Sequence, residues 1–233
     1  GSAVGMDKDI MKRLFRHAGL AVPRFVVIRK RDCSDTSFDV LQRNLGTPFF
    51  VKPCNLGSSV GISKVGTPEE FDRAMEEAFA YDTKVIVEEA ILGREVECAI
   101  LGNDQPEAST VGEIRVKGDF YSYEAKYLDG NAAELLIPAP LDDTLTRKVQ
   151  EMSIAAFEAT DCAGLARVDC FVTEEGKVLL NEINTLPGFT RISMYPKLWE
   201  HGGLPYSGLL ERLVELAEER HAAQCSLRRI HAD

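Results

Sequence analysis

The sequence lacks several features that would each assign it to a familiar class of protein. Its longest uncharged apolar stretch, residues 135–141, contains two prolines and falls far short of the ~20 residues of a membrane helix, so we expect no membrane contact. Positive charge is also scarce, because 27 lysines and arginines face 37 aspartates and glutamates, for a net charge of −10. That balance offers no general attraction to a phosphate backbone, and we expect no nucleic-acid partner.

Paired cysteines are a further absence. The six cysteines form no C-x-x-C pair. The start of the chain also lacks the charged and apolar regions of an export signal, which favours a reducing, cytoplasmic setting. We therefore expect all six to be buried thiols: Cys33, Cys54, Cys98, Cys162, Cys170 and Cys225.

The composition, 45% hydrophobic and 27% charged, is that of a folded protein with one sizeable core or two modest ones. Thr67-Pro68-Glu69-Glu70 is a capping box before one helix, and Ser207 is the expected cap of the last. Periodicity predicts helices over 7–18, 38–45, 67–79, 141–160 and 207–217, and strands over 24–29, 49–52, 62–65, 85–88, 95–101 and 109–116. Helices mixed with hairpins indicate an α+β protein with a division near Gly93.

A predicted β-hairpin over residues 165–183 carries the first candidate site. If its loop is the two residues Glu175-Gly176, strand alternation sets two polar pairs on one face: Asp169 opposite Glu182, and Arg167 opposite Asn184. Converging carboxylate and amide oxygens repel one another unless a cation neutralises them, and oxygen-only ligation suits Mg²⁺. The adjacent arginine would then address a metal-bound phosphate. The alternative is an ordinary solvated cluster of charges.

A loop rich in glycine and serine, residues 53–61, follows Lys52 at the end of an apolar strand. Its backbone amides and hydroxyls are suited to approach an anion, and the lysine adds a positive charge, so the segment resembles a phosphate-binding hairpin. It contains neither a Walker A nor a G-x-G-x-x-G pattern. A plain surface hairpin is the alternative.

The same loop contains Gly57-Ser58-Ser59-Val60-Gly61, which satisfies the G-x-S-x-G pattern of serine hydrolases. That pattern requires a strand, a turn and then a helix, whereas residues 62–65 are predicted to form another strand. The downstream histidines, His201, His221 and His231, are poorly placed for a catalytic triad. A hydrolase is therefore the remote alternative.

Two further segments carry polar groups suited to a small ligand. Glu88, Glu89 and Glu95 lie at or near strand ends, where carboxylates accept hydrogen bonds from an adenine amino group or ribose hydroxyls. Residues 121–127 combine tyrosines with one lysine and show no strong period, which is typical of a functional loop. Taken alone, either segment is explained as well by solvated surface groups.

Taken in order along the chain, these motifs resemble those of the D-alanine–D-alanine ligases from about residue 3 to 220. The matching motifs are Met6-Asp7-Lys8, Val51-Lys52-Pro53 with the loop that ends at Gly61, Tyr123-Glu-Ala-Lys-Tyr127, Arg167-Val-Asp169, Asn181-Glu-Ile-Asn-Thr-Leu-Pro-Gly188 and Ile192-Ser-Met194. The resemblance implies an ATP-grasp fold, in which two α+β subdomains, here 1–93 and 94–233, hold ATP between them. It also implies that the family's N-terminal substrate domain is absent, which leaves Ser58 and Tyr127 without a glutamate partner.

The resemblance assigns roles to single residues. The implied ATP contacts are Lys8, Lys52 and Lys126 at the phosphates, Ser58 and Ser59 in the phosphate-side loop, Glu88 and Ile91 at the adenine and Glu95 at the ribose. The implied ligands of two Mg²⁺ or Mn²⁺ ions are Asp169, Glu182 and Asn184. The implied reaction-site groups are Arg167 and Lys126 at the transferring phosphate, Gly188 as a backbone donor on the oxyanion side, Ser193 and Met194 at the second D-alanine, and Tyr127 on a closing loop.

The implied activity is the joining of two D-alanines for peptidoglycan precursor synthesis. One D-alanine carboxylate attacks the γ-phosphate of ATP to give an acyl phosphate and ADP, and the amine of the second then displaces phosphate. A ligase specific for D-lactate or D-serine is one alternative. A nucleotide-binding module without ligase activity is another, and a homodimer is compatible with either.

Overall fold

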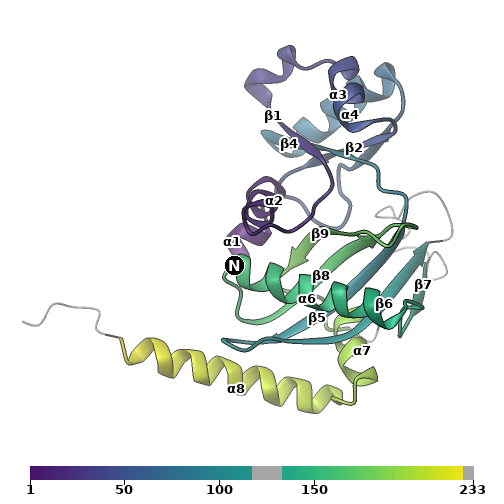
Figure 1. Ribbon diagram of the computed structural model, residues 1–233. Coiled ribbons are helices and arrows are strands. Elements are labelled where there is room, and N and C mark those ends of the chain that lie inside the picture. The colour runs from purple at the N-terminus through teal and green to yellow at the C-terminus, as the bar shows by residue number, and fades with distance from the viewer. Residues whose placement is uncertain (117–132, 191, 228–233) are drawn as a thin grey trace, which may run out of the picture.

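The computed structural model describes residues 1–116, 133–190 and 192–227, and these form two antiparallel sheets. In Figure 1 the four-stranded sheet lies above the five-stranded sheet, and helix α2 (Lys8–His17) lies between them. None of the helices within the described ranges is long and apolar enough to cross a membrane.

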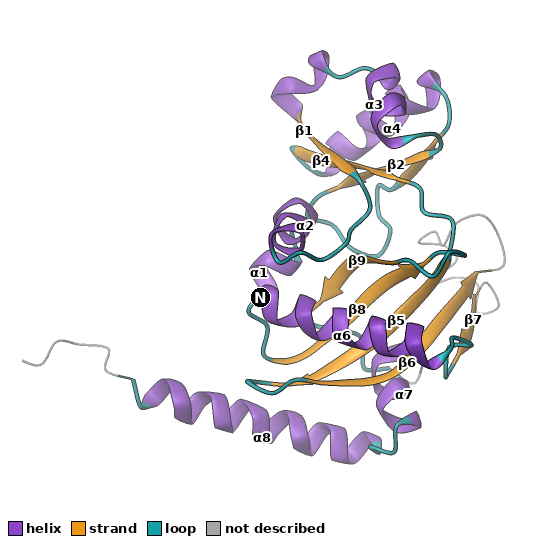
Figure 2. Cartoon of the chain, in the orientation of Figure 1, coloured by secondary structure: helices purple, strands orange, loops and turns teal. Residues whose placement is uncertain are grey.

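The smaller sheet has the strand order β1–β4–β2–β3. Its strands are β1 (Phe25–Arg29), β2 (Phe49–Pro53), β3 (Ser63–Val65) and β4 (Lys84–Glu89). The 3₁₀ helix η1 (Lys30–Asp35) follows β1, and α3 (Phe38–Leu45) and α4 (Pro68–Tyr81) pack against the sheet, as Figure 2 shows. The rings of Phe38, Phe49 and Phe71 meet in its core with centroids 5.5, 6.1 and 6.4 Å apart.

Local signals in the sequence predict α3 and α4 of this part, although not the 3₁₀ helix η1. The Thr67 hydroxyl accepts a hydrogen bond from the Glu70 amide, and the Glu70 carboxylate accepts one from the Thr67 amide, so the predicted capping box begins α4. Helix α3 ends at Gly46, whose φ of +84° lies in the left-handed region that favours glycine.

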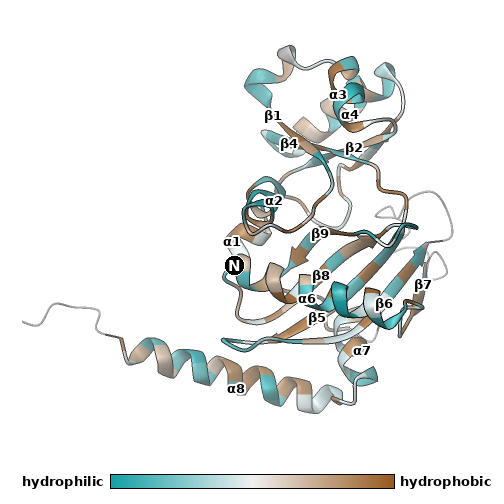
Figure 3. Cartoon of the chain, viewed as in Figure 1, coloured by the Kyte–Doolittle hydropathy of each residue, from teal (hydrophilic) through white to brown (hydrophobic). Residues whose placement is uncertain are grey.

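The larger sheet has the strand order β7–β6–β5–β8–β9. Its strands are β5 (Arg94–Gly102), β6 (Glu107–Val116), β7 (Ala133–Leu136), β8 (Gly164–Val172) and β9 (Val178–Asn184). Helix α6 (Asp143–Ala159) packs on one face, while α7 (Met194–His201) and the start of α8 (Tyr206–Cys225) pack on the other (Figure 1). Brown and teal alternate along α8 in Figure 3, and of this helix only Leu209 and Leu216 are buried.

The second face of the larger sheet changes from apolar to charged along its strands. On β5, Ala99 and Leu101 pack under α7 and α8, whereas Glu95 and Glu97 continue the same face at the other end. The alternate residues of β5 and β8, including Val96, lie in the core under α6. One sheet face therefore supplies both a core and a charged surface.

The hairpin of β8 and β9 pairs as predicted, although its loop does not. Arg167 pairs with Asn184 and Asp169 with Glu182, as expected. The two-residue loop is wrong, because the turn spans the three residues 174–176, with the Thr173 amide bonded to the Lys177 carbonyl. A register shift between Asp169 and Cys170 compensates, so that Asn181 is an extra, bulged residue on β9.

Some other predicted details are wrong. The long helix begins at Asp143 rather than at 141, because the Asp142 carboxylate caps it by accepting from the Leu145 amide. The last helix begins at Tyr206 after Pro205, whose fixed φ suits a helix start, so Ser207 lies inside the helix and does not cap it. Two cysteines are exposed, Cys33 in η1 and Cys225 at the end of α8.

Helix α2, which follows the short α1 (Ser2–Gly5), connects the two sheets. Met11 and Phe15 are fully buried in the core of the larger sheet. Charged side chains of the same helix reach β4 of the smaller sheet, where Lys84 Nζ lies 2.5 Å from Asp7 Oδ2 and 3.3 Å from Asp9 Oδ2. Asp7 is also the helix cap, since its Oδ1 accepts from the amides of the next turn.

We expect Asp7→Ala to lower the free energy of unfolding by about 2–4 kcal/mol, because it removes a cap and leaves Lys84 short of one partner. Asp7→Asn is the matched control, since its amide oxygen still caps α2 and only the charge is lost. Urea unfolding of both variants measures the difference. No loss in Asp7→Asn would contradict a contribution from the ion pair, and equal losses in the two variants would contradict one from the cap.

Candidate functional site

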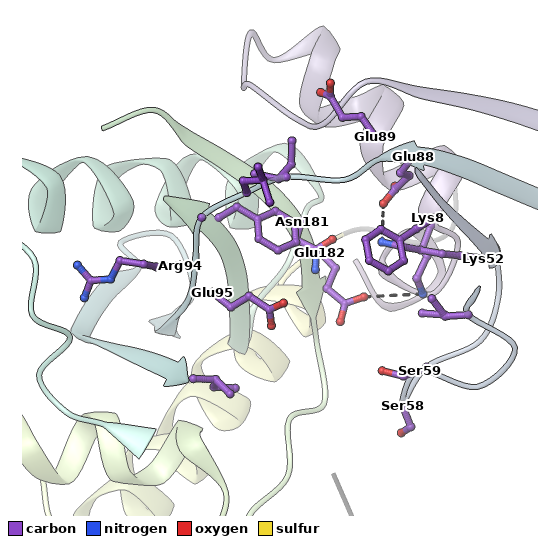
Figure 4. A pocket seen from close by; sticks show the side chains of 18 of the residues that line it. Lys8, Lys52, Ser58, Ser59, Glu88, Glu89, Arg94, Glu95, Asn181 and Glu182 are labelled. Carbon is purple, nitrogen blue, oxygen red and sulfur yellow. Dashed lines mark hydrogen bonds and ion pairs between the residues drawn. The ribbon is translucent and has the colours of Figure 1, made fainter. Parts of the chain in front are cut away.

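A cleft of about 400 Å³ lies between the two sheets. Its walls come from β2 and the loop after it, the end of β4, residues 91–95, and strands β6, β8 and β9. Eight of the residues proposed from the sequence line it: Lys8, Lys52, Ser58, Ser59, Glu88, Ile91, Glu95 and Glu182. Figure 4 shows Lys8, Lys52, Glu95 and Glu182 directed into a common space, while Arg94 points away from it.

Glu88 is the most deeply buried acid of the cleft, with 2% of its side chain exposed. Its Oε2 accepts a hydrogen bond of 2.6 Å from Lys52 Nζ, and its Oε1 lies 3.0 Å from Lys12 Nζ. Burial alone would raise the pKa of Glu88, but the two ammonium groups lower it to about 2. Burial lowers the pKa of Lys12, and Glu88 opposes that effect.

Lys8 joins the two walls of the cleft. Its ammonium donates a 2.5 Å hydrogen bond to the carbonyl of Leu56, which belongs to the glycine- and serine-rich loop. The same atom lies 3.7 Å from Glu182 Oε2 on β9. The backbone amide of Lys8 also donates a hydrogen bond, to the Cys54 carbonyl. A positive charge is thereby fixed between the loop and the larger sheet.

The loop after β2 has an unusual backbone. Ser58 and Ser59 have φ values of +55° and +59°, in the left-handed region that non-glycine residues rarely adopt. Both line the cleft beside Gly57. Such conformations cost stability and persist where the surrounding structure imposes them, so they mark this loop as a candidate functional segment.

The charged face of the larger sheet presents a row of three carboxylates. Glu97 pairs with Asp169 across β5 and β8, and Asp169 pairs with Glu182 across β8 and β9. Arg167 binds both oxygens of Asp169 at 2.7 Å and lies 3.2 Å from Glu97 Oε2. Burial works against the charged form of Arg167, but Asp169 and Glu97 raise its pKa above the ordinary value.

The proposed metal ligands offer oxygen atoms only. Asp169 and Glu182 face each other, and Asn184 faces Arg167 one pair further along β9. This donor set has the chemistry that a hard divalent cation requires. In the described part of the chain, no group of three His, Cys, Asp or Glu side chains is arranged to hold a metal ion.

Within the described ranges, the other proposed residues do not line the cleft. A Cβ atom on Gly188 would lie 2.7 Å from Ser193 Oγ, so the two segments are in contact beyond the end of β9. Met194 begins α7 and packs in the core beneath β5 and β6. Lys126 and Tyr127 fall outside the described residues.

Among the residues of the cleft and its surroundings that sequence reasoning missed, three had a signal in the sequence that could have found them. Lys12 follows Lys8 by one helical turn, a spacing that places both on one side of α2. Glu97 follows Glu95 at the two-residue period of one strand face. Asn181 lines the cleft because of the bulge. The sequence feature that indicates the bulge is the pair of adjacent polar residues, Asn181 and Glu182, in an otherwise alternating strand.

The structure also bears on the hydrolase alternative. The loop that contains Ser59 leads into β3, which pairs with β2, so the strand, turn and helix of a nucleophile elbow do not occur there. His201 contacts Thr110, and His221 lies on α8 beside Cys225. Among the described residues, no histidine lines the cleft.

Comparisons with known proteins agree with the sequence motifs. Residues 14–215 match the family described as "D-ala D-ala ligase C-terminus". The chain is 52% identical over 233 residues to the D-alanine--D-alanine ligase of Oceanobacillus iheyensis, covering 100% of this chain and 64% of that protein. It is 51% identical over 227 residues to D-alanine--D-alanine ligase A of Escherichia coli K12, covering 97% of this chain and 62% of that protein.

Solved structures of similar proteins superpose closely. The D-alanine-D-alanine ligase of Coxiella burnetii gives a TM-score of 0.83 at 43% identity, covering 95% of this chain and 59% of that one. The VanG D-Ala:D-Ser ligase of Enterococcus faecalis gives 0.84 at 39% identity, covering 92% of this chain and 62% of that one. The chain thus spans less than two thirds of the length of these proteins.

The buried Glu88 predicts a specific dependence of stability on pH. Its pKa in the folded protein is about 2, below the ordinary 4.5, so its charged form stabilises the fold above pH 4.5 and this contribution is lost as the pH falls toward 2. We expect Glu88→Gln to lose less unfolding free energy than the unmodified chain between pH 6 and pH 3. Glu89→Gln, on the neighbouring residue, is the control. Identical losses in the unmodified chain and Glu88→Gln would contradict the assignment.

Proposed function

The chain belongs to the D-alanine–D-alanine ligase family and has its ATP-grasp fold, and from this premise we propose that it binds ATP in the cleft and joins two D-alanines. One observation carries the proposal. Lys8 and Lys52, from separate elements, converge with the strained serine loop on a cleft that carboxylates of the opposite sheet also line. Fixed ammonium groups and a close backbone are what a nucleotide polyphosphate requires.

The two sheets suggest how the nucleotide is held. We place the base near Glu88 and Ile91, the ribose near Glu95, and the phosphates between Lys8, Lys52 and the loop of Ser58 and Ser59. The two subdomains divide near Gly93, between β4 and β5, with α2 contacting both. Closing the cleft on the nucleotide would exclude water from the reacting groups.

Asp169, Glu182 and Asn184 would hold Mg²⁺ or Mn²⁺ beside the phosphates. When bound, the metal would neutralise phosphate charge. Arg167 lies beside this set, and its planar guanidinium is suited to hold the oxygens of the transferring phosphate. In the structure, that guanidinium donates to both oxygens of Asp169.

The proposed reaction has two steps with no covalent enzyme intermediate. The carboxylate of the first D-alanine attacks the γ-phosphate, and the bond to the β-phosphate breaks to give an acyl phosphate and ADP. The amine of the second D-alanine attacks the acyl carbon, loses a proton and expels phosphate to give the dipeptide. Arg167 and Lys126 would offset charge on the phosphoryl group, and the Gly188 amide would donate to the oxyanion.

Ser193 and Met194 are the proposed seat of the second D-alanine, and Tyr127 belongs to the segment that would close over it. The likeness to a D-Ala:D-Ser ligase makes D-serine the alternative second substrate. The dipeptide would serve peptidoglycan precursor synthesis in the cytoplasm.

The decisive experiment supplies the purified 233-residue chain with ATP, Mg²⁺, K⁺ and excess D-alanine. We expect ADP and D-alanyl-D-alanine to appear in equal amounts, measured by coupled assay and mass spectrometry, because the described residues proposed to bind ATP line the cleft. Parallel reactions with D-serine and D-lactate identify the second substrate. ATP binding without any dipeptide, in a folded sample, would restrict the chain to nucleotide binding, and absence of both would overturn the proposal.

We expect Lys52→Met to weaken ADP binding by about tenfold or more, because a positive charge is lost from the phosphate site. Lys64→Met on β3 is the matched control, since Lys64 is exposed and does not line the cleft. Isothermal titration calorimetry with ADP measures both. Similar affinities for the two variants would place the phosphates elsewhere.

A further inference from the structure

Lys12 is a buried cation that the proposed function does not use. Only 1% of its side chain is exposed, and it does not line the cleft. We propose that Lys12 is a positioning residue. It neutralises Glu88 from the buried side, away from the cleft, and so leaves the charge of Lys52 available to a nucleotide phosphate. The proposal rests on the proposed function, because it concerns the same cleft.

The geometry assigns the two oxygens of Glu88 to two different lysines. Lys12 Nζ lies 3.0 Å from Oε1 on the buried side, and Lys52 Nζ lies 2.6 Å from Oε2 on the cleft side. Lys52 retains 12% exposure, whereas Lys12 has no route to a ligand. Lys12 therefore acts on the cleft only through Glu88.

The charge of this triad, defined as Lys12, Glu88 and Lys52, explains why the second lysine matters. Two ammonium groups and one carboxylate carry a formal charge of +1. Without Lys12, Glu88 and Lys52 would form a neutral pair, and a phosphate would have to compete with Glu88 for Lys52. In a site of low dielectric constant, that competition weakens phosphate binding more than base binding.

The fold holds Lys12 in place independently of the cleft. Its neighbour Met11 and Phe15, one turn further on, are fully buried in the core of the larger sheet. Glu88, in contrast, belongs to β4 of the smaller sheet. The contact therefore crosses from one sheet to the other, and the packing of α2 fixes the ammonium group against the carboxylate.

The test compares ADP with adenosine, because the two ligands differ only in their phosphates. We expect Lys12→Met to weaken ADP binding about tenfold more than adenosine binding, since the triad charge falls from +1 to 0. The double variant Lys12→Met/Glu88→Gln restores a charge of +1, so its ratio of ADP to adenosine affinity should return toward that of the unmodified chain. Calorimetric titration of each variant gives both dissociation constants.

Lys84→Met is the matched control for a purely structural role. Lys84 also joins α2 to β4 through buried ion pairs, but its partners are Asp7 and Asp9 and it does not line the cleft. We expect this variant to change ADP and adenosine affinities by the same factor. A change in the affinity ratio as large as that of Lys12→Met would overturn the proposal.

The outcomes separate the inference from the proposed function. Failure of the unmodified chain to bind ADP would overturn the proposed function itself. ADP binding by the unmodified chain with an unchanged affinity ratio in Lys12→Met would overturn only the role of Lys12. If Lys12→Met does not fold, Glu88→Gln and the double variant still differ in triad charge, +2 against +1. Equal affinity ratios in those two variants would then overturn the proposal.

Discussion

The contact between helix α2 and strand β4 is the constraint on which the cleft depends. Met11 and Phe15 of α2 pack into the larger sheet, while charged side chains of the same helix meet the smaller sheet. Buried charges are costly unless each has its partner in place, so the two sets of ion pairs tolerate little displacement of one sheet relative to the other. The apolar contact supplies the attraction, and the ionic contact defines the position.

In the larger sheet, one face serves both as part of the core and as a charged surface. Its second face packs under α7 and α8 where Ala99 and Leu101 lie, and becomes a charged surface where Glu97 and Asp169 lie. A strand has only two faces, so a site built on a sheet must give up burial somewhere. Here the loss is confined to one end, and Arg167 between the carboxylates limits their mutual repulsion.

The extent to which sequence predicts this structure differs between local and non-local features. Capping boxes, glycine helix ends and strand alternation concern neighbouring residues, and they placed α3 and α4 correctly. The ion pair of Lys12 with Glu88 joins residues far apart in the sequence and on different elements, so no local pattern reports it. The packing of α2 against the larger sheet also joins distant parts of the chain, and no local pattern in the sequence indicates it. The cleft residues that were predicted were found through the family motifs rather than through periodicity.

The hairpin shows why a prediction can succeed when one of its premises fails. A regular hairpin with the observed three-residue turn would set Glu182 opposite Val168 in the core and turn Ile183 toward the cleft. Burying that carboxylate and exposing that isoleucine would cost far more than interrupting one stretch of ladder. A bulge at Asn181 avoids both costs, since Leu180 and Ile183 then face the core and the two polar residues between them face the cleft. The polar and apolar pattern of β9 therefore determines the pairing more strongly than the loop length does.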